Sequence, residues 1–156
     1  SLYIPDKLLH ACGMFTSNQI ALFYPLFAMF VLVNLVMCRL GSLRISQIRN
    51  KQVSPQFHQA HQGGEEPKAS RLAARNLANL FEVPILFYVL VLTAMILNYS
   101  NEPMLILCWI YVVLRYAHSF VHVTFNHVPT RFIVYCLSCL TLILLWIDLL
   151  VTVLER

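Results

Sequence analysis

The sequence contains a run of 31 consecutive residues, positions 8–38, without a Lys, Arg, Asp or Glu. A helix needs about 20 predominantly apolar residues to cross the hydrocarbon core of a bilayer. A soluble domain has about 25% charged residues, whereas this chain has 12%, and 59% of it is hydrophobic. So few charges cannot cover a surface that faces water. These features exclude an ordinary soluble domain, a disordered tail and a nucleic-acid module, and they predict an integral membrane protein.

The length of 156 residues allows four spanning helices with their connections. We expect spans at about 18–40, 77–99, 104–126 and 131–154. A polar segment at about 41–70 contains Pro and Gly-Gly signals typical of a loop, and the second helix is expected to begin near Pro67. Short polar turns at 100–103 and 127–130 place the later helices antiparallel. The sequence therefore predicts one all-α membrane domain, residues 1–156, folded as an up-down-up-down four-helix bundle.

The distribution of Lys and Arg predicts the orientation. The first connection and its flanks hold seven of these residues, namely Arg39, Arg44, Arg49, Lys51, Lys68, Arg71 and Arg75. The third connection has Arg131, and the second has none. Because Lys and Arg are enriched in cytoplasmic loops, we expect the first and third connections in the cytoplasm and both termini on the other side.

Ionisable groups inside a span cost about 2.5–3.5 kcal/mol each, so they are candidates for function. A first set lies at the start of the second span, at Arg71, Arg75, Asn79 and Glu82. Spacings of 4, 4 and 3 place these residues on one helix face. They form either a self-paired helix end or a socket for a charged ligand.

A second set lies on one face of the third span, at Arg115, His118, His122 and Asn126. A single His in a helix is usually a packing residue, but a polar stripe of this length favours a binding site or an interface between helices. Asn126 alternatively ends the helix.

Arg131 and Tyr135 lie four residues apart at the start of the fourth span, directly after Pro129. Backbone N–H groups at a helix N-terminus favour anions. An Arg at this place can stabilise a thiolate or an oxyanion. The alternative is an interfacial Arg that binds lipid phosphate.

Two other patterns predict less. Cys136 and Cys139 form a C-x-x-C inside a span, where they are best interpreted as small packing residues. His118 and His122 could together bind a metal or haem, but no carboxylate accompanies them. We therefore expect no metal site.

The segments RNLANLFEVPILFYVL and LRYAHSFVHVTFNHVPTRFIVY, at 75–90 and 114–135, resemble the MAPEG family, the membrane-associated proteins in eicosanoid and glutathione metabolism. The resemblance extends from about Phe23 to Leu154. The spacing from Arg115 to Tyr135 is similar to that of the prostaglandin E synthase branch. The overall sequence of the two segments looks more like the uncharacterised bacterial branch. That likeness implies a location in a bacterial inner membrane.

The resemblance implies a homotrimer that binds glutathione between subunits near the cytoplasmic face. It implies that Arg75, Asn79 and Glu82 hold the charged ends and amides of the peptide. His118, Arg115 and Tyr135 would hold other parts, and Arg131 would stabilise the thiolate. Arg39 is the nearest match to a first-helix arginine of the family, with Arg44 second. The polar faces add Arg71 and His122 to the candidate binding residues.

The chain departs from the prostaglandin branch at three positions. His122 stands where that branch has a tyrosine, His127 where it has an arginine, and Phe132 where it has a serine. The sequence predicts a glutathione-dependent transferase or peroxidase that acts on apolar electrophiles. The first alternative is a non-catalytic lipid-binding or interaction protein on the same scaffold, and a weaker one is a His-ligated metal or haem protein.

Overall fold

The computed structural model describes residues 17–53 and 66–155. Within these ranges the secondary structure is entirely helical. The helices are α2 (Ser17–Arg49), α4 (Lys68–Phe81), α5 (Pro84–Ile96), α6 (Glu102–Val123) and α7 (Val128–Leu154).

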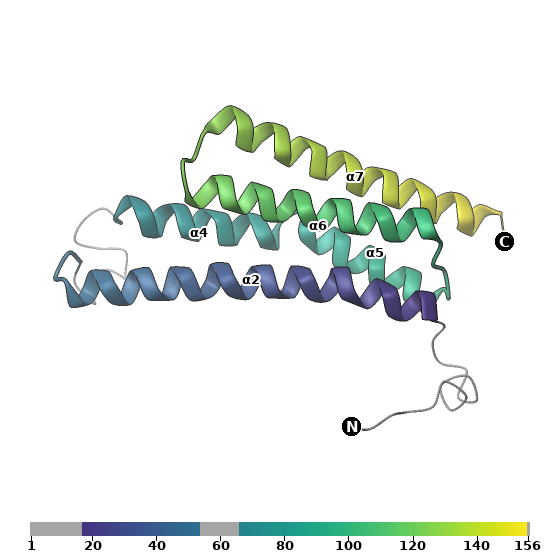
Figure 1. The fold of residues 1–156 in the computed structure, drawn as a ribbon, viewed down its shortest axis with the longest axis horizontal. Coiled ribbons are helices and arrows are strands. Elements are labelled where there is room, and N and C mark those ends of the chain that lie inside the picture. The colour runs from purple at the N-terminus through teal and green to yellow at the C-terminus, as the bar shows by residue number, and fades with distance from the viewer. Residues whose placement is uncertain (1–16, 54–65, 156) are drawn as a thin grey trace, which may run out of the picture.

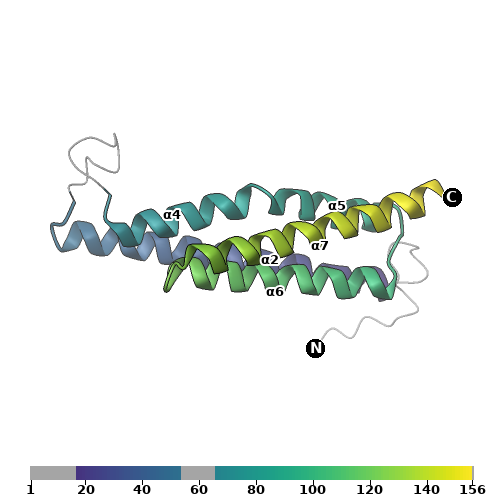
Figure 2. The same ribbon diagram turned by 90° about the horizontal axis from the view of Figure 1, so that it is seen from above.

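The helices form an antiparallel bundle in which α4 and α5 together make one of four passages (Figures 1 and 2). Helix α2 packs against α4, α5 and α6, and α7 packs against α5 and α6. Each passage is long and apolar enough to cross a membrane: Gln19–Arg49, Lys68–Ile96, Glu102–Val123 and Val128–Leu154. The expected four-helix membrane bundle is therefore confirmed. Helix α2 extends past position 40, where we expected its span to end, as far as Arg49.

Apolar side chains occupy both the interior and the outer faces of the bundle. The core contains fully buried Leu22, Phe87, Tyr111 and Leu145, and the rings of Phe87 and Tyr111 stack at 4.5 Å between centroids. Many large apolar side chains on α2, α5, α6 and α7, and Phe81 at the end of α4, are nevertheless exposed in the single chain. Lipid tails are as apolar as these side chains, so an outer surface of this kind is compatible with direct contact to the bilayer.

The expected second helix begins at Lys68 and is divided at Glu82 and Val83. Pro84 is the first residue of α5. Proline has no N–H to donate, and its ring clashes with the carbonyl four residues earlier, so a continuous helix through this position is disfavoured. The division leaves the last carbonyls of α4 without helical partners.

A hydrogen-bonded network joins the α5–α6 connection to the end of α7. The Tyr99 hydroxyl donates to Asp148 Oδ2 at 3.0 Å, and Asn101 Nδ2 donates to the Tyr99 oxygen at 2.6 Å. Asn101 Oδ1 accepts from the backbone N–H of Met104 at 2.8 Å, which caps α6. Burial raises the pKa of Tyr99 above its ordinary value of 10.0, which keeps its hydroxyl a donor. Asp148 therefore accepts a hydrogen bond that links α7 to the α5–α6 connection.

Substituting Asn101 with alanine is expected to lower the free energy of unfolding by about 1–2 kcal/mol, because a helix N-cap is lost. Thermal unfolding in detergent micelles measures this change. Asn101→Ser is the matched control, since its hydroxyl can accept the Met104 N–H and keep the cap, while the amide bond to Tyr99 is lost without a change of charge. An Asn101→Ala variant as stable as the wild type would show that the cap contributes nothing.

Candidate functional site

Arg115 is fully buried on α6. Its Nη2 donates to the backbone carbonyl of Asn79 at 2.9 Å. Its Cζ lies 5.9 Å from the centroid of the Tyr135 ring, within the range of a cation–π contact. Nε and Nη1 have no hydrogen-bond partner within the described residues. Arg115 therefore has two buried donors without a partner in the part of the chain that the structure describes.

The break after α4 explains where the Arg115 side chain points. Asn79 belongs to the last turn of α4, whose carbonyls have no N–H four residues further along the helix. A cationic donor at a helix C-terminus satisfies such a carbonyl and interacts favourably with the helix dipole. Pro84, which imposes the break, thus helps to position Arg115.

Two buried imidazoles follow Arg115 along α6. His118 and His122 are 3% and 1% exposed, with ring centroids 6.0 Å apart. His118 Nδ1 lies 3.3 Å from the backbone oxygen of Arg131, and the His118 ring is 5.9 Å from that of Tyr135. His118 Nε2 and His122 Nδ1 have no partner among the described residues. Both rings therefore offer a free nitrogen in the interior.

Arg131 lies in the first turn of α7. Its Nη1 donates to Asn126 Oδ1 at 2.8 Å. Asn126 adopts a φ of 44°, a left-handed conformation that Asn tolerates better than most residues. The turn between α6 and α7 therefore fixes the guanidinium at a helix N-terminus, where both groups attract anions.

A cavity of about 180 Å³ opens between α4, α6 and α7. It is lined by Asn79, His118, Val128, Arg131, Phe132 and Tyr135. Val128 and Phe132 are 58% and 65% exposed and form an apolar lip. The cavity therefore has polar side chains on its inner wall and apolar side chains at its outer edge, where lipid tails can contact them.

The other candidate residues lie around this cavity or apart from it. Arg115 does not line the cavity, but it contacts two residues that do, Asn79 and Tyr135. His122 likewise lies beside the lining residue His118. Arg71, Arg75 and Glu82 are exposed on α4 and at its end, and Arg39 is exposed on α2. None of these four lines the cavity.

Sequence reasoning missed a buried pair behind the imidazoles. Asn76 and Ser119 are 0% and 3% exposed, and the Ser119 hydroxyl donates to Asn76 Oδ1 at 3.2 Å. Spacing could have indicated the pair, because Ser119 follows Arg115 by four residues and Asn76 precedes Asn79 by three. The polar layer between α4 and α6 is therefore wider than the charged residues suggested.

The described residues contain no cluster of three or more His, Cys, Asp or Glu side chains that could hold a metal ion. Cys136 is exposed and Cys139 half-buried, and neither forms a disulfide. His58 and His61 lie outside the described residues.

Fold and site together define a helical membrane protein with a polar cavity at one end of its bundle. The sequence model of the MAPEG family matches residues 20–151. The chain therefore belongs to the MAPEG family, as its two motifs indicated. No curated protein and no solved structure matches the chain.

Proposed function

We propose that the protein is a glutathione-dependent transferase or peroxidase that acts on apolar electrophiles. The observation that carries this proposal is Arg115, a fully buried guanidinium with two unpartnered nitrogens beside a polar cavity. A buried charge without partners is costly. A ligand carboxylate is the natural complement, because it accepts bidentate hydrogen bonds from a guanidinium.

Glutathione fits the charges around the cavity. It carries two carboxylates, one ammonium group, amides and a thiol. We assign Arg75, Asn79 and Glu82 to its charged ends and amides, and Arg115, His118 and Tyr135 to its other parts. His122 adjoins His118 as a further polar contact. Arg39 and Arg71 supply outer cations. Glutathione then acts as co-substrate.

Arg131 is proposed to stabilise the thiolate. A nearby guanidinium and a helix N-terminus both lower the pKa of a thiol, and the thiolate is the nucleophile. In a transferase step, thiolate sulfur forms a bond to an electrophilic carbon, and the leaving group departs with its electron pair. In a peroxidase step, the thiolate attacks the terminal hydroperoxide oxygen and the O–O bond breaks, which gives a sulfenic acid and an alkoxide that takes up a proton to become an alcohol. A second glutathione thiol then attacks the sulfenic acid, which gives the disulfide and releases water.

The second substrate is proposed to enter from the bilayer. Val128 and Phe132 present apolar surface at the edge of the cavity. Phe132 in place of a polar residue suits an apolar electrophile or a lipid hydroperoxide. The same surface also suits the alternative, in which the protein binds lipid without catalysis.

The exposure of Arg71, Arg75 and Glu82 in the single chain supports a site that a neighbouring copy completes. We therefore propose a homotrimer. We further propose that the cavity faces the cytoplasm of a bacterial inner membrane, that both termini lie on the other side, and that residues 1–156 form one domain.

Purified protein in micelles is expected to release or absorb heat when titrated with millimolar glutathione. An analogue with a methyl group in place of the thiol should still bind, but more weakly, because it keeps the proposed contacts to the peptide and loses only the contact of Arg131 to sulfur. Isothermal titration calorimetry measures both. Absence of binding, with co-purified lipid present, would favour the non-catalytic alternative, and a Soret band would favour haem.

A further inference from the structure

Among the residues that the structure describes, basic side chains gather at one end of the bundle and acidic ones dominate the other. The end of α2 and the start of α4 hold the basic residues Arg39, Arg44, Arg49, Lys51, Lys68, Arg71 and Arg75. The described acidic residues near them are Glu66 and Glu82. At the other end, the described residues include Glu102, Asp148 and Glu155 but no Lys or Arg.

The basic residues lie on a part of the bundle that extends beyond α6 and α7. Figure 1 shows the end of α2 and the start of α4 projecting past the α6–α7 connection. Helix α2 has 33 residues, and at 1.5 Å per residue it is about 50 Å long. The hydrocarbon core is about 30 Å thick, so this end of α2 reaches the headgroups.

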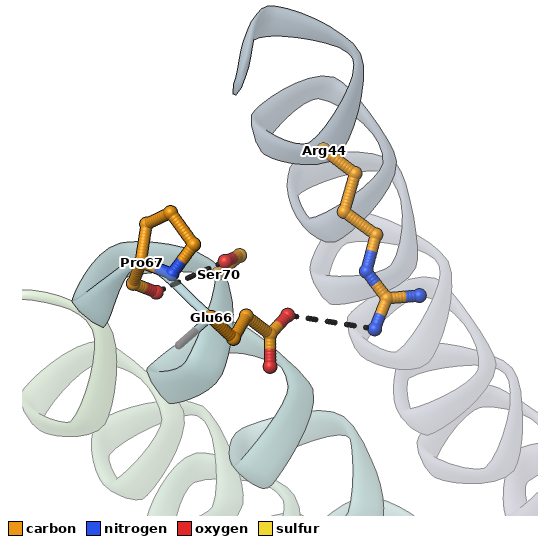
Figure 3. Close-up of polar contacts among 4 residues, drawn as sticks. All are labelled: Arg44, Glu66, Pro67 and Ser70. Carbon is orange, nitrogen blue, oxygen red and sulfur yellow. Dashed lines mark hydrogen bonds and ion pairs between the residues drawn. The ribbon is translucent and has the colours of Figure 1, made fainter. Parts of the chain in front are cut away.

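Most of these cations point away from the bundle. Arg39, Arg49, Lys51 and Lys68 are all exposed. Arg44 differs, because its Nη2 lies 3.6 Å from Glu66 Oε1 and ties α2 to the segment before α4 (Figure 3). That ion pair links the two projecting elements, which also pack against each other.

Apolar side chains stand between the cations on α2. Ile45 and Ile48 are 69% and 37% exposed, close to Arg44 and Arg49 in the chain. A surface for a soluble polyanion would not gain from exposed isoleucines. At an interface, such side chains enter the acyl boundary while long basic side chains reach the headgroups.

We propose that this surface, Arg49, Lys51 and Lys68 with Ile45 and Ile48, binds anionic phospholipid headgroups of the adjacent leaflet. We call it the basic end. Each cation near an anionic surface raises affinity by roughly fivefold. The basic end anchors the bundle at a fixed depth, independently of glutathione and of any catalysis at the cavity.

The test is native mass spectrometry of the full chain released from micelles with equal phosphatidylglycerol and phosphatidylcholine of the same acyl chains. The wild type is expected to carry phosphatidylglycerol over phosphatidylcholine by roughly tenfold or more. The triple variant Arg49→Gln, Lys51→Gln, Lys68→Gln is expected to carry the two lipids nearly equally. High salt should reduce the wild-type preference, because exposed charges are screened.

The matched control is Arg49→Lys, Lys51→Arg, Lys68→Arg, which keeps the charges and should keep the preference. Glu155→Gln changes charge at the opposite end and should leave the ratio unaltered. A wild-type ratio near one, or an unchanged ratio in the neutral variant, overturns the proposal, as does retained nucleic acid without lipid preference. If the triple variant does not fold, Lys51→Gln and the salt titration decide the question.

Discussion

Substitution of Arg131 by alanine is expected to lower glutathione-dependent turnover by about 10²–10³-fold, the usual effect of removing one group that stabilises a developing or resting anion. Arg131 is held in the first turn of α7 by Asn126, so its guanidinium and the helix N-terminus act on the same place. The loss should appear in kcat, because the peptide part of glutathione is held elsewhere. Steady-state formation of the thioether from a chlorodinitrobenzene electrophile measures it.

Two further variants separate charge from position. Arg131→Lys keeps the charge but lacks the planar fork, so it should recover part of the rate. Asn126→Ala removes the partner of Nη1 and should cost less than Arg131→Ala. The ultraviolet absorbance of the bound thiolate should fall in parallel with the rate. Unchanged turnover in Arg131→Ala would remove this residue from its proposed role.

The sequence predicted the four spanning segments because the bilayer restricts which secondary structures a segment can adopt inside it. Backbone polar groups in hydrocarbon must be paired within a helix, so a long uncharged run such as 8–38 has one solution. The break at Glu82 and Val83 was harder to predict, although Pro84 is visible in the sequence. Proline is common both at a first helical turn and at a kink, and only packing determines which occurs.

Helical periodicity predicted which candidate residues lie close together. His118 and Tyr135 line one wall because each follows an arginine by three or four residues on its own helix. The bond from Arg115 to the carbonyl of Asn79 was not predictable in this way. A pattern of side chains along the sequence does not show which backbone carbonyls lack a partner. The Asn79 carbonyl is available only because α4 ends two residues later, at Phe81.

Replacing Arg115 with methionine is expected to weaken glutathione binding by about 30-fold to 1000-fold, the cost of losing one partner of a buried charged hydrogen bond. The free energy of unfolding should change by no more than about 2 kcal/mol in either direction, because two opposing effects combine. Methionine relieves the cost of burying a guanidinium with two unpartnered nitrogens. It also leaves the Asn79 carbonyl without a partner, which costs about 1–3 kcal/mol, so the two effects oppose each other.

Tyr111→Phe is the matched control for that variant. Tyr111 is fully buried on the same helix, its hydroxyl has no partner among the described residues, and it does not line the cavity. Removing this hydroxyl should leave glutathione binding unchanged. Calorimetry and thermal unfolding on both variants then separate two roles for Arg115. Lost binding with a stable fold identifies a ligand-binding residue, whereas unfolding of Arg115→Met alone identifies a cap that only holds the broken end of α4.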